Sequence, residues 1–430
     1  MPNITRLSLP NGLLILLEEN HNAPVISQWI WYRVGSRDEQ SGQTGISHWV
    51  EHMQFKGTPR FPANTLDKAI ARLGGYWNAY THLDWTTYFE TMPADKIELA
   101  IQLEADRMVN STFDPAEVAS ERRVVISERE GSENEPVFQL SEAVQTSAFS
   151  THNYRHEVIG NLTDLQTMQR DDLFSHYRSY YIPNNVVLAI AGDFETESML
   201  ERLRQAYEPI PRGQQPARSI SPEPAQASER RVTINGQAGT TYIELAYHVP
   251  AATHPDFFSL MVADSLLSGA GSINMFSSGI SNRTSRLYRA LVERELAVSI
   301  HGGLQATVDP FLYSFTAIVH PESSVEKVIA ALETEIEHLI ETPPSQEEIK
   351  RAVKQARALF AYSSESVTNQ AFWMGFSEMI ATHHWYENYL AQLEAVSSHD
   401  VQSVAQEYLR PQNRTLGVYL PGSNGSEGEA

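Results

Sequence analysis

The pattern of apolar and polar positions predicts alternating strands and helices along the chain. Residues 12–17 form a short apolar run, and residues 78–92 alternate and are rich in Tyr, Trp, Thr and Phe. Both patterns are typical of strands. Apolar residues recur at helical spacing over 96–108 and over the segment that opens at Pro115 and runs to 130, as in amphipathic helices. The pattern therefore predicts an α+β fold in which antiparallel sheets pack against helices.

Part of this pattern occurs twice. The sequence YYIPNN at 180–185 precedes an apolar run, and YLRPQN at 408–413 precedes another. Pro183 and Pro411 are 228 positions apart, and Pro93 and Pro321 have the same separation. An amphipathic helix follows each member of the second pair. Two separate blocks at one offset indicate two copies of one α+β unit.

Length and composition divide the chain in the same way. A chain of 430 residues is too long for one ordinary core and suits two domains of about 200 residues. The stretch between residues 209 and 230 is rich in Pro, Gln, Ser and Arg and reads as a linker. We predict a first domain at 1–212, a linker at 213–231, a homologous domain at 232–420 and a disordered tail at 421–430.

Candidate chemistry lies in the first copy. His48, Glu51 and His52 stand at positions i, i+3 and i+4, which fall on one face of a helix. Two His nitrogens at this spacing can supply half of the tetrahedral shell of Zn²⁺. Glu51 directly precedes the second His and could act as general base on the attacking water without binding the metal. A surface helix that carries these residues by chance is the alternative.

The best source of a third ligand is the helix predicted over 115–130. Glu121 and Glu128 are seven residues apart, two helical turns, so they share a face. One of them can bind the metal while the other hydrogen-bonds a ligating His and fixes its tautomer. Glu130 lies on a different face and is a weaker choice. A solvated acidic face is the alternative interpretation of this spacing.

Three ordered blocks resemble the pitrilysin, insulysin and mitochondrial processing peptidase family of inverted zincins. They are GISHWVEHMQFKGT at 45–58, NAYT through TY at 78–88, and ERRVVISE at 121–128. The resemblance implies a zinc metalloendopeptidase with His48, His52 and Glu128 as the metal ligands and Glu51 as the catalytic residue. It also implies that Glu121 is a supporting carboxylate behind the ligands.

The same resemblance places the substrate beside the block at 78–88. In the family this strand pairs with the backbone of an extended peptide, which implies substrate binding at Asn78 and Ala79. An exposed edge strand can add a peptide by main-chain hydrogen bonds. A turn role for Asn78, which follows Gly74 and Gly75, is an equally good interpretation of the residues alone.

The second copy lacks these residues. No H-x-x-E-H pattern follows residue 220, and the adjacent His383 and His384 should point to different helix faces, so we interpret them as surface or core residues. In the family a second copy or partner subunit supplies an Arg and a Tyr that contact the substrate. In the corresponding stretch 286–298, Val292 and Val298 stand at those positions.

An intact zinc set beside a missing pair suggests the zinc-carrying subunit of a heterodimer whose homologous partner brings the Arg and Tyr. A homodimer is a second possibility, and a non-catalytic scaffold like the core subunits of respiratory complexes is a third. The small lyase that completes an H-x-x-E-H pair with a Cys is disfavoured, because this chain has no Cys.

The net charge and the first residues of the chain limit the partners and the cellular location that we expect. A formal net charge of −21 disfavours nucleic acid and anionic membranes as partners and is compatible with peptide substrates. The first residues lack a basic segment followed by an apolar one, and no run of 18 apolar residues occurs. We expect a cytoplasmic bacterial protein, or a periplasmic one if a leader was removed.

Overall fold

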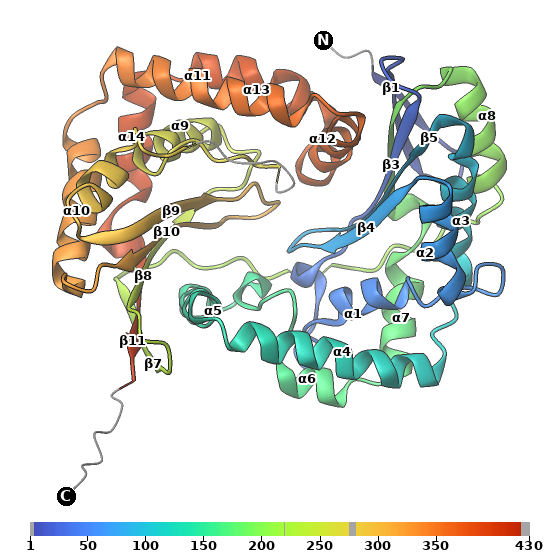
Figure 1. Ribbon diagram of the computed structural model, residues 1–430, viewed down its shortest axis with the longest axis horizontal. Helices are drawn as coiled ribbons and strands as arrows, with labels where there is room; N and C mark the ends of the chain where they lie inside the picture. The colour runs from blue at the N-terminus through green and yellow to red at the C-terminus, as the bar shows by residue number, and fades with distance from the viewer. Residues whose placement is uncertain (1–3, 219, 275–280, 423–430) are drawn as a thin grey trace, which may run out of the picture. The chain divides into compact units, whose positions relative to one another are not determined.

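The computed structural model describes residues 4–218, 220–274 and 281–422 (Figure 1). The chain divides into two compact units. Unit 1 consists of Met1–Arg129, His152–Ser221 and Ala361–Tyr389. Unit 2 consists of Glu130–Thr151, Pro222–Phe360 and Leu390–Ala430. Residues 423–430 of the predicted tail lie outside the described residues.

Unit 1 is built on a six-stranded sheet with the order β1-β2-β6-β3-β5-β4. The strands β2 and β6 are parallel, and the other neighbours are antiparallel. The strands are β1 (Ile4–Ser8), β2 (Leu14–Glu19), β3 (Val25–Tyr32), β4 (Tyr76–Thr81), β5 (Thr86–Pro93) and β6 (Val186–Gly192). Within the described residues β4 is therefore an edge strand.

Helices cover both faces of this sheet. Figure 1 shows α3 and α8 on one face and α12 on the opposite face. The helices that lie wholly in unit 1 are α1 (Ile46–Met53), α2 (Ala63–Arg72), α3 (Glu98–Asn110), α6 (Leu162–Thr167), α7 (Arg170–Tyr180), α8 (Thr196–Tyr207) and α12 (Val367–Ile380). Ile15, Ile30, Leu188 and Ile190 are fully buried between the sheet and α3 and α8, because residues on alternate positions of a strand share one face.

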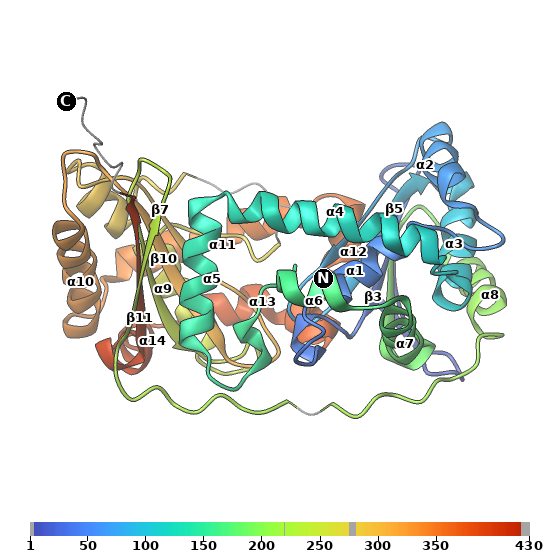
Figure 2. The same ribbon diagram turned by 90° about the horizontal axis from the view of Figure 1, so that it is seen from below.

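Unit 2 contains a five-stranded sheet with the order β7-β11-β8-β10-β9. Its strands are β7 (Arg230–Gly236), β8 (Tyr242–Val249), β9 (Ala297–Leu304), β10 (Phe311–Val319) and β11 (Arg414–Pro421). The helices wholly within this unit are α5 (Pro136–Ala148), α9 (Phe257–Leu267), α10 (Val325–Glu341) and α14 (Ser398–Tyr408). Figure 2 shows α5 and α10 on opposite sides of the sheet. The helices α4 (Pro115–Glu133), α11 (Gln346–Ser363) and α13 (His383–Ala395) each belong partly to one unit and partly to the other.

The two sheets confirm the duplication. The order β2-β6-β3-β5-β4 in unit 1 matches β7-β11-β8-β10-β9 in unit 2, and the first two strands of each series are parallel. β6 begins at Val186 and β11 at Arg414, which is the 228-residue offset seen in the sequence. The predicted α+β class with two sheets packed with helices is thus confirmed. β1 is an additional edge strand of unit 1.

Each sheet is covered by one helix from the other half of the sequence. α12 packs on β3 and β6, and α5 packs on β7, β8 and β11. Glycines allow both close approaches: a Cβ at Gly375 of α12 would lie 2.0 Å from Trp31, and one at Gly417 of β11 would lie 2.3 Å from Val144 of α5. The compact units are therefore not contiguous, whereas the predicted domains are. One of the passages from unit 1 to unit 2, after Ser221, falls inside the predicted linker.

One predicted strand is wrong. Residues 78–92 do not form a single strand but a hairpin, in which β4 and β5 pair antiparallel from Tyr76↔Thr91 to Thr81↔Thr86. The connection, residues 82–85, contains no Gly or Pro, so it lacks the residues that mark turns most strongly. None of the helices in the described part of the chain combines the length and the apolar character that a membrane span requires.

Candidate active site

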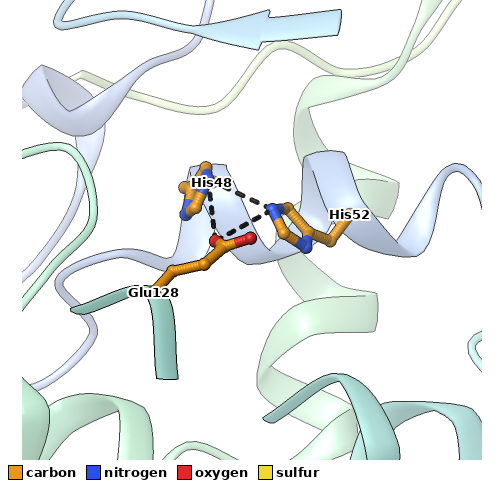
Figure 3. Close-up of side chains that lie close together, drawn as sticks. All are labelled: His48, His52 and Glu128. Carbon is orange, nitrogen blue, oxygen red and sulfur yellow. Dashed lines mark hydrogen bonds and ion pairs between the residues drawn. The ribbon is translucent and has the colours of Figure 1, made fainter. Parts of the chain in front are cut away.

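The helix α1 holds the H-x-x-E-H residues in place through its apolar side. Ile46, Trp49, Val50 and Met53 are buried, and α1 packs against α7 and the hairpin strands β4 and β5. This anchoring presents His48 and His52, one helical turn apart, toward Glu128 of α4. Figure 3 shows that the three side chains point to a common centre.

The donor atoms of these residues lie close together. His48 Nε2 and His52 Nε2 are 3.2 Å apart. Glu128 Oε2 lies 3.5 Å from His52 Nε2 and 4.0 Å from His48 Nε2. The two imidazoles are largely buried, with 18% and 16% of their side-chain surfaces exposed, whereas the Glu128 side chain is 44% exposed. The group is therefore open on the side of the carboxylate.

This donor set fits a zinc ion. Zinc bonds of about 2.0–2.1 Å in tetrahedral geometry place neighbouring ligand atoms about 3.3–3.4 Å apart. The observed separations of 3.2, 3.5 and 4.0 Å require only a small movement of Glu128. Burial, reinforced by the nearby His52, lowers the pKa of His48 to about 3. His48 is thus neutral at physiological pH, as a metal ligand must be.

Glu51 lies next to the three donor residues, but its side chain forms a hydrogen bond with a residue outside that group. Its Oε2 accepts a hydrogen bond of 2.7 Å from Thr81 Oγ1 at the end of β4. The residue is 8% exposed. Burial raises the pKa of Glu51, and the hydrogen bond from Thr81 and the neighbouring His52 offset this only in part. A carboxylate whose pKa is raised toward neutrality is suited to take up and release a proton.

Glu121 contacts His52 at the ring nitrogen that is not part of the donor group. Its Oε1 lies 2.9 Å from His52 Nδ1, which leaves Nε2 of that ring directed at the donor group, and its other oxygen pairs with Lys56. Although burial raises the pKa of Glu121, the hydrogen bonds to His52 and Lys56 outweigh it and lower the pKa below its usual range. Glu121 is therefore an ionised carboxylate that orients His52.

The predicted substrate residues lie on the edge strand. Asn78 is exposed and Ala79 is half-buried in β4. The N–H of Ala79 donates to Asn78 Oδ1 at 2.9 Å. A peptide that pairs with β4 at this position must take over that N–H from the Asn78 side chain. The side chains of Tyr76 and Tyr80 on the same strand are also exposed.

Val292 and Val298 lie in unit 2. Val292 is half-buried, and Val298 in β9 is 55% exposed. Neither side chain offers a charge or a hydroxyl. The Arg and Tyr that the family resemblance calls for are therefore absent from these two positions.

Sequence reasoning missed three residues that the structure brings to the site. Thr81 and Lys56 lie within the blocks at 78–88 and 45–58 that carry the family resemblance. Their contacts could not be derived from residue spacing. Glu39 carried no signal. Its two carboxylate oxygens accept from the backbone N–H groups of Gly45 (2.8 Å) and Ser47 (2.9 Å) at the start of α1. Glu39 thereby fastens the helix that carries His48 and His52.

We expect Glu39→Gln to loosen the start of α1. A glutamine has one acceptor oxygen for two N–H groups, so one buried donor loses its partner at a cost of about 1–3 kcal/mol. Hydrogen exchange measured by mass spectrometry should then show the Gly45 and Ser47 amides exchanging about tenfold faster or more. Asp171→Asn, at a carboxylate that is 91% exposed, is the control. Unchanged exchange in α1 would show that Glu39 does not hold it.

Two family models match most of the chain. The model described as "Insulinase (Peptidase family M16)" matches residues 14–161, which include the whole donor group. The model described as "Peptidase M16 inactive domain" matches residues 167–356. The second match begins after the last candidate site residue.

Relatives of known sequence match along almost the full length. An uncharacterized zinc protease of Streptomyces coelicolor is 27% identical over 96% of this chain and 89% of its own. Zinc protease PqqE of Helicobacter pylori is 26% identical over 98% and 93%. The beta subunit of the mitochondrial-processing peptidase of Blastocladiella emersonii is 24% identical over 95% and 87%.

Solved structures agree with these matches. A protease from Helicobacter pylori superimposes with a TM-score of 0.91 at 25% identity and covers 98% of this chain and 100% of that one. A chain of complex III from Candida albicans shares the fold at 16% identity, with a TM-score of 0.77 over 97% and 96% of the two chains. From the two matching models, the full-length relatives and the shared fold, we conclude that this chain belongs to peptidase family M16.

Proposed function

We propose that this chain is a zinc metalloendopeptidase that hydrolyses peptides or unfolded oligopeptides. The observation that carries this proposal is the convergence of His48, His52 and Glu128 beside the buried carboxylate of Glu51. The names of the relatives support it at the level of the family, because several are zinc proteases.

Each residue has a distinct part in the proposed reaction. His48, His52 and Glu128 would hold the zinc ion, which when bound lowers the pKa of water toward about 7 and polarises the scissile carbonyl. Glu51 takes the proton of the attacking water and delivers it to the leaving amine. The hydrogen bond from Thr81 to Oε2 holds this carboxylate in place. Glu121 keeps the His52 ring in its binding orientation.

The substrate is proposed to bind in extended form along β4. The edge strand offers backbone groups at Asn78 and Ala79, and Thr81, its last residue, hydrogen-bonds Glu51. Main-chain pairing with β4 would therefore lead a peptide toward the general base. Because such pairing reads backbone rather than side chains, it favours unfolded peptides of varied sequence.

We further propose that the chain works as the catalytic subunit of a dimer. The valines at positions 292 and 298 leave the Arg and Tyr of the family to be supplied by a homologous partner. The Blastocladiella relative is itself named as a subunit, which supports this arrangement. A homodimer without the pair is the other form that the proposal allows.

A non-catalytic scaffold is the second candidate function. It draws support from the "inactive domain" model and from the fold shared with a complex III chain. The donor group argues against it, because a scaffold needs neither converging ligands nor a buried carboxylate beside them. The "inactive domain" match covers residues 167–356, which excludes all four of these residues.

Peptide hydrolysis tests the proposal. The chain alone and the assembly that co-purifies with it from the native source are assayed with an unstructured peptide, with and without a zinc chelator. Chelator-sensitive cleavage is expected in the assembly and little or none in the isolated chain. Full activity of the isolated chain would exclude the heterodimer requirement. An assembly that contains zinc but cleaves no peptide would favour the scaffold.

A further prediction concerns Glu121. Replacing it by glutamine removes the ionised partner of His52, which should weaken zinc binding about 10–100-fold. Zinc affinity is measured by competition with a chelator of known affinity. Glu117→Gln, an exposed residue one turn earlier on α4, is the matched control. An affinity unchanged by Glu121→Gln would remove Glu121 from the account.

A further inference from the structure

A second cluster of metal-ligating side chains lies where α12 is followed by α13. His383, His384 and Glu387 each offer one ligand atom, and these atoms all lie within 4.8 Å of one another. All three residues belong to unit 1 but none belongs to the donor group of α1 and α4. The sequence expectation that the adjacent imidazoles diverge is wrong, because their ring centroids are 4.0 Å apart with an interplanar angle of 36°.

A buried carboxylate orients the first imidazole. Glu378 of α12 has a side chain that is 3% exposed. Its Oε1 lies 3.0 Å from His383 Nδ1 and accepts the backbone N–H of His383 at 3.1 Å. This leaves Nε2 of His383 for another partner. A carboxylate that fixes one ring nitrogen and presents the other is the arrangement that supports metal-binding histidines, and Glu121 has the same relation to His52.

The other two side chains come from one turn of α13. His384 and Glu387 are at i and i+3, and His384 Nδ1 lies 2.6 Å from Glu387 Oε2. The His384 side chain is 67% exposed and that of Glu387 is 24% exposed. An ion arriving from solvent therefore has access. An imidazole and a carboxylate already in contact can bind it after small rotations of their side chains.

The residues between the ligands are held firmly. The ring of Tyr386 stacks on Trp373 at 5.8 Å, and Trp385 packs against Phe376 and Tyr389. Tyr386 is 6% exposed. This packing fixes the backbone of the first turn of α13, so the cost of ordering the ligands is small.

From these contacts we infer that His383, His384 and Glu387 form a second site for a divalent transition-metal ion. The two imidazoles and one carboxylate select Zn²⁺, Co²⁺, Ni²⁺ or Cu²⁺ over Ca²⁺ and Mg²⁺, which prefer sites made of oxygen atoms alone. A bound ion would tie the start of α13 to Glu378 in α12. The site goes beyond the proposed peptidase function and does not depend on it.

Cobalt titration of the metal-free full chain tests this inference, with visible absorbance and equilibrium dialysis as the readouts. The wild type should bind two equivalents, and His384→Ala/Glu387→Gln should bind one. His399→Ala, at an exposed histidine of α14, should keep two. The double variant changes side chains at the surface, so its fold is expected to persist.

A second pair of variants separates the two sites. His48→Ala/His52→Ala should retain one equivalent of cobalt, and adding His384→Ala/Glu387→Gln to it should abolish binding. Two equivalents in His384→Ala/Glu387→Gln, or none in His48→Ala/His52→Ala, would overturn the inference. Loss of the peptidase site alone would leave the cobalt bound at His383 and His384 unchanged, so the two proposals fail independently.

Discussion

Glu51→Gln should reduce peptide hydrolysis about 10²–10⁴-fold while zinc stays bound. Glutamine keeps the shape of the side chain and can still accept the hydrogen bond from Thr81, which the carboxylate accepts at 2.7 Å, but it cannot take a proton from water at neutral pH. Loss of a general base costs rate by this factor. Zinc should remain because Glu51 is not among the three donors that converge.

Hydrolysis and metal content are measured on the same preparation. Glu117→Gln serves as the control, since it makes the same chemical change on an exposed surface. A Glu51→Gln protein that keeps most of its activity would show that another group accepts the proton. A protein that loses its zinc would place Glu51 among the ligands instead.

Glu128→Gln should remove one zinc ion per chain, and activity with it. The neutral amide is a much weaker ligand than a carboxylate, and only His48 and His52 would remain. Two imidazoles leave half of the tetrahedral shell without protein ligands. Metal content after dialysis is the direct readout, and hydrolysis at added zinc is the second.

The matched control for Glu128 lies two residues along the same helix. Glu130 is exposed like Glu128, and Glu130→Gln should keep both the zinc and the activity. The opposite result, with zinc lost from Glu130→Gln and kept in Glu128→Gln, would move the third ligand to Glu130. If both variants kept the zinc, Glu128 would not be the third ligand.

The parts of the fold that follow from a repeated sequence pattern could be predicted. Which helix packs on which sheet could not. The 228-residue offset reveals the duplication, and the matching sheet orders confirm it. The sequence does not indicate that α5 and α12 each cover the sheet of the other half. An apolar helix face indicates that a sheet packs on it, but not which sheet. The connection at 82–85 was missed because it lacks Gly and Pro.

The candidate site divides in a similar way. Spacing within one helix brings His48, Glu51 and His52 together, and spacing within another marks Glu121 and Glu128. The contacts of Thr81 and Lys56 depend on how the hairpin and α4 pack against α1. Glu39 acts through backbone N–H groups, which a sequence does not display. The convergence of His383 and His384 arises at the first turn of α13, where helical spacing alone does not set the side-chain directions.

The most direct test of the account is zinc-dependent hydrolysis by the assembly purified from the native source. Zinc is removed with a chelator, the activity toward an unstructured peptide is measured, and zinc is then added back to the wild type and to Glu51→Gln. Activity should disappear with the metal and return in the wild type only. Cleavage that persists without zinc, or that returns equally in Glu51→Gln, would contradict the account.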